Sequence, residues 1–499
     1  MASPKVYNFL SPSNSKKKLL RKKPNTLWMA VGLTAVAIAS AAGGALLAVS
    51  LASTPLLQSR LHPNDAKVFD QGDISTGVNF RLPALTRPVT ILVLGMKVLS
   101  SDVNNPPPEA ANLGYHSLVN SFDGLSDTML MLRFDPTTYK LVVLSIPRDT
   151  RTWIEGLGTT KLNEANAYGG PALAATSVTN LLGDVPIDRY VRINVQGVEK
   201  LVDALGGVTV YVPQDMKYTD ESQHLYIDLK QGEQHLDGKK ALDFLRFRYD
   251  RLGDIGRVQR QQMLMRALVE QTLSPATLTR IPQILTVIQE NVDTNLSVEE
   301  LVALVGFAAQ TERANLQMLM LPGDFSESGD YEASYWLPNQ ARIDGLIARY
   351  FRPELAVEAG TTVHTDSEAG TEIETEVESG AGMENLGYAA GDRTVEIAIQ
   401  DSTGDATTAQ DVRSQLEQQG YRNLFVDEPW NEPLSVTRII AQRGDIDSAK
   451  ALQAILGVGE VLVQGSGNIR SDITIQLGTD WVQHQAGSLN SSASNPASR

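Results

Sequence analysis

The chain has 499 residues, of which 42% are hydrophobic and 20% are charged. This composition is that of a globular protein long enough for more than one domain, and it excludes fibrous, collagen-like and wholly disordered chains. The chain contains no cysteine, which excludes disulfides, thiolate zinc sites and a cysteine nucleophile.

The net charge of −15 is distributed unevenly along the chain. Seven Lys or Arg residues and no acid precede Leu27, so the rest of the chain has 36 basic against 58 acidic residues and a net charge of −22. A body this acidic repels nucleic acid. We therefore expect no nucleic-acid partner.

The N-terminal region has the pattern of a membrane anchor. The stretch from Leu27 to Leu57 contains no charged residue, and about 20 apolar residues suffice to cross a bilayer as a helix. We predict a transmembrane helix over residues 27–50. By the positive-inside rule, the basic tail of residues 1–26 stays in the cytoplasm. The expected location is the plasma membrane, crossed once, with the bulk of the chain outside the cytoplasm.

A cleaved signal peptide is the alternative interpretation of the same stretch, because Ala48, Ser50 and Ala52 resemble a small-residue cleavage site. The long basic lead and the length of the uncharged stretch favour a retained anchor. Residues 51–87 are mixed and contain proline, and we assign them to a connecting segment.

Alternating strand and helix patterns then predict a layered α/β domain over residues 88–325, which ends in residues 326–352. The apolar run from Val89 to Gly95 predicts a buried strand, and a Pro- and Asn-rich loop follows over residues 104–120. Further strands are predicted at residues 128–135, 140–147, 190–195, 208–213 and 316–323, with helices at residues 163–182, before Ala204 and, three or four in number, between residues 238 and 310.

A second, small α/β domain is predicted over residues 393–482. It is separated from the first by residues 353–392, which contain ten acids and no Lys or Arg and therefore predict a disordered, self-repelling linker. Residues 483–499 are rich in Ser and Asn, and we expect a disordered tail. Strands are predicted at residues 395–402, 437–444, 460–464 and 472–478, and helices at residues 406–419 and 446–456.

Arginine residues cluster with aspartates in the first domain. The sequence has no HExxH, GxSxG or Walker pattern, which disfavours protease, lipase and NTPase functions. Guanidinium groups match phosphate oxygens in pairs, so several that converge would hold a pyrophosphate. The alternative is that these arginines are solvated ion-pair partners of nearby acids. The residues concerned are Asp127, Arg148, Asp149, Arg246, Arg248, Arg251, Asp254, Arg257 and Arg260.

Two short spacings within this cluster carry geometric expectations. On the helix predicted near Gly256, Arg257, Arg260 and Gln261 lie at i, i+3 and i+4 and are expected to share one face. Arg246 and Arg248 are two residues apart, which places them on one face only where the chain is extended.

Four ordered stretches of the first domain resemble the LytR-CpsA-Psr (LCP) family. They are SDTMLMLRFDPTTYKLVVLSIPRDT, KLNEANAYGGPALA, LVDALGGVTVYVP and QGEQHLDGKKALDFLRFRYDRLGDIGRVQRQQ, which lie in this order between Val89 and Gln271. Residues 394–481 resemble the LytR C-terminal domain more loosely. The resemblance implies an LCP-type layered domain with a central mixed sheet flanked by helices.

The resemblance also implies a function. Family members are membrane-anchored phosphotransferases that move a glycopolymer from a polyprenyl-pyrophosphate carrier to peptidoglycan. By this resemblance the pyrophosphate-binding residues are Arg148, Arg246, Arg248, Arg257 and Arg260, with Gln261 beside them. Asp127 matches an aspartate associated with Mg²⁺, and Asp254 matches a second acid near the phosphates. Apolar residues between sheet and helices would line a tunnel for the lipid.

The residue that removes the proton from the acceptor hydroxyl stays open among Asp127, Asp149 and Asp254, since metal coordination is a competing role for each. For Asp149, the alternative is that it orients Arg148. We assign the catalytic group to Arg148, Asp127, Asp149 and Asp254 together.

One position departs from the family pattern. Where relatives usually carry an Asp two residues after the glycine that ends the first strand, this chain has Lys97. A cation there weakens a nearby Mg²⁺ site but can itself neutralise pyrophosphate oxygens. We therefore expect Mg²⁺ as cofactor with reduced or altered dependence. The alternative is that the adjoining insertion displaces Lys97 and Asp102 restores the acid.

Three other functions compete with the transferase. One is a membrane-bound transcriptional attenuator, but a cytoplasmic tail of about 26 residues is too short for a folded DNA-binding module. The second is a non-catalytic protein that binds an envelope polymer. The third is a pyrophosphatase, in which water replaces the sugar hydroxyl as acceptor.

Overall fold

The computed structural model describes residues 56, 58, 61–69, 72–76, 83–96, 122–221, 225–247, 254–327, 329–352, 393–405 and 407–493. The predicted tail, membrane span and acidic linker, over residues 1–26, 27–50 and 353–392, lie outside the described residues. Among the residues described, no helix is long and apolar enough to cross a membrane. From residue 56 onward, the described residues form one compact unit.

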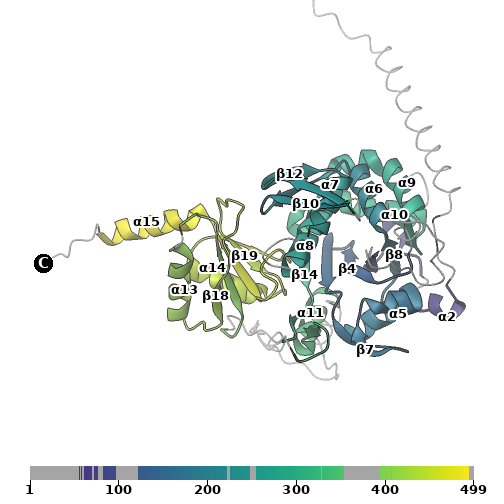
Figure 1. Ribbon diagram of the computed structural model, residues 1–499, viewed down its shortest axis with the longest axis horizontal. Helices are drawn as coiled ribbons and strands as arrows, with labels where there is room; N and C mark the ends of the chain where they lie inside the picture. Colours follow the sequence, from purple (N-terminus) through teal and green to yellow (C-terminus); the bar gives the residue numbers. More distant parts are fainter. Residues whose placement is uncertain are drawn as a thin grey trace, which may run out of the picture. The chain divides into compact units, whose positions relative to one another are not determined.

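A six-stranded mixed sheet forms the centre of the first domain (Figure 1). Strand β3 runs parallel to β8, and β5 runs parallel to β14, whereas the other neighbours are antiparallel. The apolar runs near residues 89, 128 and 140 thus form adjacent strands, which confirms the predicted mixed sheet. In sheet order the strands are β13 (Val292–Thr294), β8 (Arg189–Ile193), β3 (Val89–Met96), β4 (Ser126–Asp135), β5 (Lys140–Ile146) and β14 (Leu316–Met320).

Helices cover both faces of this sheet, because its strands are apolar on both sides. Met129 and Met131 of β4 share a buried core with residues of α5 and α11. Phe134 points to the opposite face, where its ring meets that of Phe307 in α10 edge to face, with centroids 5.6 Å apart. The helices of the domain are α2 (Pro63–Ala66), α5 (Glu164–Leu181), α6 (Val195–Leu205), α7 (Gly238–Arg246), α8 (Asp254–Thr272), α9 (Ile281–Asn291), α10 (Val298–Gln310) and α11 (Gln340–Tyr350).

Short hairpins and turns surround the sheet, and most of them were not predicted from the sequence. The hairpin β6–β7 directly follows β5 and turns at Gly156, whose φ of 82° favours glycine. The remaining elements are β1 (Ser75–Thr76), β2 (Ala84–Leu85), β6 (Arg151–Ile154), β7 (Gly158–Lys161), β9 (Val208–Val212), β10 (Met216–Asp220), β11 (Leu225–Leu229), β12 (Gly232–Leu236), β15 (Gly323–Phe325), β16 (Trp336–Pro338) and the 3₁₀ turns Pro275–Arg280 and Arg313–Asn315.

The second domain is a small α/β unit with its own core, as predicted. Its five-stranded sheet has the order β18-β17-β21-β19-β20, and fully buried residues such as Ile399, Leu452 and Ile475 fill the space between sheet and helices. Its elements are β17 (Ile397–Asp401), α13 (Thr408–Gln418), β18 (Leu424–Val426), β19 (Arg438–Ala441), α14 (Ile446–Leu456), β20 (Glu460–Leu462), β21 (Ile473–Leu477) and α15 (Thr479–Ala493).

Helix α15 extends into the segment that we expected to be disordered. The expected tail begins at residue 483, whereas the helix ends at Ala493. The segment contains no proline before residue 496, and Asp480 in the first turn interacts favourably with the helix dipole. The Ser and Asn residues of this segment are therefore compatible with a helix that Trp481 anchors in the core.

The short edge strand β13 is held by a buried ion pair, whose loss should destabilise the fold. Arg192 of β8 contacts Asp293 at 2.6 Å, and both side chains are less than 5% exposed. We expect Asp293→Ala to lower the free energy of unfolding by about 3–5 kcal/mol, because Arg192 is left buried without its carboxylate. Urea denaturation followed by circular dichroism measures this change.

The control is Glu290→Ala, which breaks the nearby exposed pair of Lys200 and Glu290. That pair should contribute at most about 1 kcal/mol. Equal effects of the two substitutions would contradict the stabilising role of the buried pair.

Candidate active site

Arg148 forms the centre of a charged cluster at one end of the central sheet. Strand β4 begins at Ser126 and pairs antiparallel with β5. The start of β4 and the end of β5 therefore lie at the same end of the sheet. Asp127 therefore meets the segment that follows β5. Arg148 Nη1 contacts Asp127 Oδ1 at 2.6 Å, and Arg148 Nε donates to Asp149 Oδ2 at 3.2 Å.

Lys161 completes the cluster from the β6–β7 hairpin. Its Nζ lies 2.8 Å from Asp149 Oδ1, so Asp149 is shared between two cations. The main chain of Asp149 is fixed as well, because its carbonyl accepts a 2.9 Å hydrogen bond from Trp336 N. The ion pairs thus link Asp127, Arg148, Asp149 and Lys161 in a row, and each of the four side chains is about a fifth to a quarter exposed.

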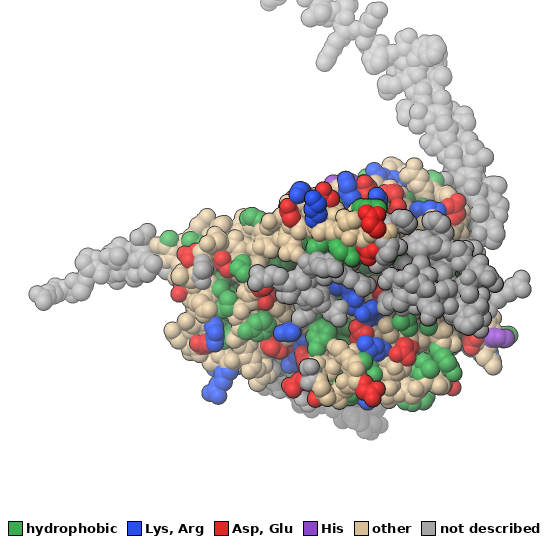
Figure 2. All heavy atoms as spheres, viewed as in Figure 1, with side chains coloured by type: hydrophobic (Ala, Val, Ile, Leu, Met, Phe, Trp, Pro, Cys, Tyr) green, Lys and Arg blue, Asp and Glu red, His purple; other side chains and the backbone are tan. Residues whose placement is uncertain are grey.

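The cluster keeps Arg148 charged. Burial tends to lower the pKa of Arg148, but the attraction and hydrogen bonds of Asp127 and Asp149 outweigh burial and raise it above its ordinary value. On the face seen in Figure 2, Lys and Arg side chains are interspersed with Asp and Glu.

An apolar cavity of about 60 Å³ adjoins the cluster. It brings together five of the residues predicted from the sequence, namely Asp127, Arg148, Asp149, Arg257 and Gln261. Arg257 and Gln261 are one turn apart on α8, which explains why both reach the same cavity. Much of the remaining lining is apolar: Met129, Leu130, Val143, Ile146, Val258, Met265, Met318, Leu319, Met320, Phe325, Trp336 and Ile469.

Arg260 departs from the expected common face of α8. It is 3% exposed, its guanidinium donates to the carbonyl of Phe247, and it lines a different cavity together with Gln259 and Met263. On a helix it lies about 60° from Arg257 and about 100° from Gln261, so it points to an adjacent flank of α8, where it contacts Phe247. The expectation of a single face for these three residues is therefore wrong.

Some of the other predicted site residues lie outside the part of the chain that the structure describes. Arg246 ends α7 and is not among the residues that line the apolar cavity. Asp254 begins α8, but its side chain lies outside the described part of the chain. Lys97 and Arg248 lie outside the described residues altogether.

The sequence reasoning missed three contributors to the site. Lys161 reaches Asp149 because β7 pairs with the strand that follows Asp149, and the hairpin would have had to be recognised first. Arg266 also lines the cavity and pairs with Glu270 at 2.8 Å. The third is a loop of the second domain, Gln464 to Ile469, for which no sequence pattern gave a signal.

The described residues offer little to a metal ion. Within the described ranges, no group of three or more His, Cys, Asp or Glu side chains is placed to hold one. Asp127 and Asp149, the described acids of the cavity, are both paired with Arg148. Both described carboxylates of the cavity are therefore already paired with a cation.

The family model of the LytR-CpsA-Psr proteins matches residues 62–350, more than half of the chain. The chain belongs to the LytR-CpsA-Psr family. Residues 394–481 match a second model, described as LytR cell envelope-related transcriptional attenuator. The two matches fall on the two domains, and they confirm both parts of the resemblance.

Curated relatives of this LCP protein include two transferases of Bacillus. The polyisoprenyl-teichoic acid–peptidoglycan teichoic acid transferase TagU of Bacillus anthracis is 34% identical over 223 residues, which cover 44% of this chain and 71% of TagU. The corresponding transferase TagV of Bacillus subtilis is 33% identical over 228 residues, covering 44% of this chain and 58% of TagV. The crystal structure of B. subtilis TagV aligns with a TM-score of 0.43 at 28% identity, over 53% of this chain and 96% of that chain. The chain is therefore a distant homologue of these enzymes.

The geometry of the cluster predicts that Arg148 is coupled more strongly to Asp127 than to Asp149. The first contact is shorter, and Asp149 retains Lys161 when Arg148 is removed. A double-mutant cycle with Arg148→Ala and Asp127→Ala should give a coupling energy of about 1 kcal/mol, since the pair is only partly buried.

The matched cycle with Asp149→Ala should give a smaller coupling. Both are measured as unfolding free energies in urea. A larger coupling to Asp149 would show that Arg148 is held chiefly by its sequence neighbour.

Proposed function

We propose that this LCP protein is a phosphotransferase that moves a glycopolymer from a polyprenyl-pyrophosphate carrier to peptidoglycan. The observation that carries the proposal is the position of Arg148, Arg257 and Gln261 beside two carboxylates at an apolar cavity. Charged groups suited to a pyrophosphate and an apolar lining suited to a lipid chain are thus contiguous. The printed activity of TagU and TagV, transfer of teichoic acid from a polyisoprenyl carrier to peptidoglycan, supports the same reaction class.

The reaction needs charge neutralisation more than covalent help from the protein. An acceptor hydroxyl oxygen bonds to the phosphorus next to the glycan, the bridging P–O bond breaks, and polyprenyl monophosphate leaves. The hydroxyl proton passes to a carboxylate, for which Asp127, Asp149 and Asp254 stay the candidates. Arg148 stabilises the charge that develops on the phosphate oxygens, since its guanidinium stays protonated at any working pH.

Arg148 can bind a phosphate without giving up either carboxylate. Its contacts with Asp149 and Asp127 use the N–H of Nε and one N–H of Nη1, whereas a guanidinium has five N–H donors. A phosphate oxygen that binds the other donors lies close to both carboxylates, which are among the candidates that accept the proton from the acceptor.

The proposed anchoring is that the apolar helix of residues 27–50 holds the protein in the plasma membrane with both domains outside the cytoplasm. The carrier lipid resides in the same membrane, so an anchored enzyme meets its substrate at high local concentration. The envelope side is where peptidoglycan is available as acceptor.

Substitution of Arg148 tests the proposed reaction directly. The full chain in detergent is mixed with a polyprenyl-pyrophosphate oligosaccharide and peptidoglycan fragments, and glycan joined to peptidoglycan is measured by mass spectrometry. Arg148→Ala should lower the transfer rate at least about 100-fold, because a donor that stabilises transition-state charge is lost. The transfer rate of Arg148→Lys should lie between those of wild type and Arg148→Ala, since lysine keeps the positive charge but lacks the paired N–H donors of a guanidinium.

The matched control is Arg413→Ala, which removes a partly exposed arginine of α13 that pairs with Glu417 in the same helix. It should leave transfer unchanged. Release of lipid without joining would identify a pyrophosphatase, and binding without turnover would identify a polymer-binding protein. Either result would contradict the proposed transferase function.

We further propose that Mg²⁺ is less important here than in relatives with an Asp at position 97. Asp127 would hold the ion, but the described carboxylates of the cavity are already paired with Arg148, and Lys97 repels a divalent cation if it lies nearby. Lys97→Asp should therefore increase the stimulation of transfer by Mg²⁺. The test is transfer with Mg²⁺ or with EDTA, for wild type and variant, and equal strong stimulation of both proteins would contradict the proposal.

A further inference from the structure

The second domain covers the outer edge of the central sheet at β14. Strand β14 is the last strand of that sheet, and an edge strand presents unpaired N–H groups. Here Met318 N donates to Val463 O, and Met320 N donates to Gln442 O, both at 2.9 Å. The two alternate donors of the β14 edge are therefore satisfied by carbonyls of the second domain.

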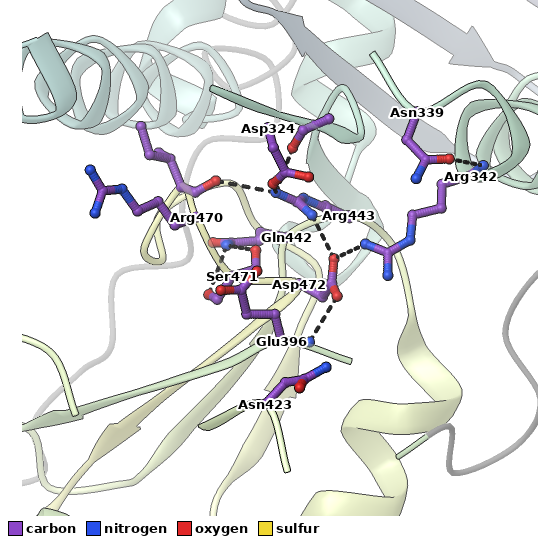
Figure 3. Close-up of polar contacts among 12 residues, drawn as sticks. Asp324, Asn339, Arg342, Glu396, Asn423, Gln442, Arg443, Arg470, Ser471 and Asp472 are labelled. Atoms are coloured by element: carbon purple, nitrogen blue, oxygen red, sulfur yellow. Dashed lines mark hydrogen bonds and ion pairs between the residues drawn. The ribbon is translucent and has the colours of Figure 1, made fainter. Parts of the chain in front are cut away.

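A buried ion cluster fixes the second domain at this edge (Figure 3). Arg443 is 1% exposed, contacts Asp472 at 2.7 Å, and donates to the carbonyl of Gly323 at 2.8 Å. Asp472 also pairs with Arg342 of α11 in the first domain. Removal of one member would leave another charge buried without its partner, so the cluster favours one arrangement of the two segments.

The cluster positions a loop of the second domain against the apolar cavity. This loop, residues 463–471, joins β20 to β21 and begins at the carbonyl that Met318 N contacts. Gln464, Gly465, Ser466 and Ile469 of the loop line the cavity together with Asp127 and Arg148. Ile469 is 1% exposed and belongs to the core of the first domain.

Gly465 lies closely against α8. A Cβ atom at this position would lie 3.2 Å from Oε1 of Gln262, and Nε2 of Gln262 in turn contacts the sulfur of Met320 at 3.2 Å. The loop, α8 and β14 thus form one continuous wall. The second domain is part of the cavity and not merely adjacent to it.

The cavity is small compared with the ligand that the proposed function requires. Its volume of about 60 Å³ is well below the about 300–1,000 Å³ that ligand cavities usually measure. Its walls can adapt, since several are methionines. The loop is another wall, and it is attached to a different domain from the sheet.

We propose that loop 463–471 of the second domain is part of the binding site for the apolar chain of the lipid-linked substrate, and that it determines how well long chains bind. This inference rests on the proposed function, because it takes the carrier to be a polyprenyl pyrophosphate. The loop contacts the chain and not the pyrophosphate, so it discriminates by chain length.

The absence of native cysteine allows a test on the folded full chain. In Ser466→Cys, a partly exposed residue of the loop becomes the only thiol. Bound undecaprenyl pyrophosphate should slow modification of this thiol by a methanethiosulfonate reagent at least about tenfold, whereas geranyl pyrophosphate, with the same head group, should not slow it. Ser414→Cys, at an exposed position on α13, is the matched control and should react equally fast in all three states.

The same variant gives a second readout. Attachment of a benzyl group at position 466 should weaken binding of undecaprenyl pyrophosphate about tenfold, as expected if contact with about two methylene groups is lost. Binding of geranyl pyrophosphate should stay unchanged, and dithiothreitol should restore the original affinity. Because the group is attached after folding, misfolding cannot account for the loss.

The outcomes separate the two proposals. Tight binding of both lipids without protection or weakening at position 466 would overturn the role of the loop and leave the proposed function intact. Failure of the unmodified protein to bind either lipid would overturn the proposed function and this inference with it.

Discussion

The site depends on one guanidinium shared by two carboxylates. Antiparallel pairing of β4 and β5 places Asp127 beside the segment of Arg148 and Asp149, and without a cation the two acids would repel each other at that edge. Arg148 neutralises both, and its own pKa is raised in return. The protein therefore holds the guanidinium of Arg148 in place and charged, which is what the proposed role in anion binding requires.

The rest of the site is arranged around this interaction. Lys161 holds Asp149 from the β6–β7 hairpin, and the main chain of Trp336 fixes the same residue from β16. Helix α8 then adds Arg257 and Gln261 along the cavity. Strand ends and one helix turn thus supply the polar groups, while the apolar lining comes from the strands, from α8 and from the loop of the second domain.

Local patterns in the sequence predicted what local geometry determines. The apolar strands and the one-turn spacing of Arg257 and Gln261 follow from chain periodicity, and both were found in the structure. The side chosen by Arg260 was not predictable, because helix spacing does not tell which side of α8 meets Phe247. The hairpin that brings Lys161 to Asp149 was missed because its strands have only four residues each, too few for a periodic signal.

The contribution of the second domain could not be read from the sequence for a different reason. Met318 and Val463 are far apart in the chain, and their hydrogen bond depends on which edge of the sheet is exposed. An exposed edge is a liability that proteins cover or block, and here the segment that covers it also reaches the cavity. The same segment therefore protects β14 and completes the cavity. This double role explains why the second domain, which has its own core, also places a loop residue in the core of the first domain.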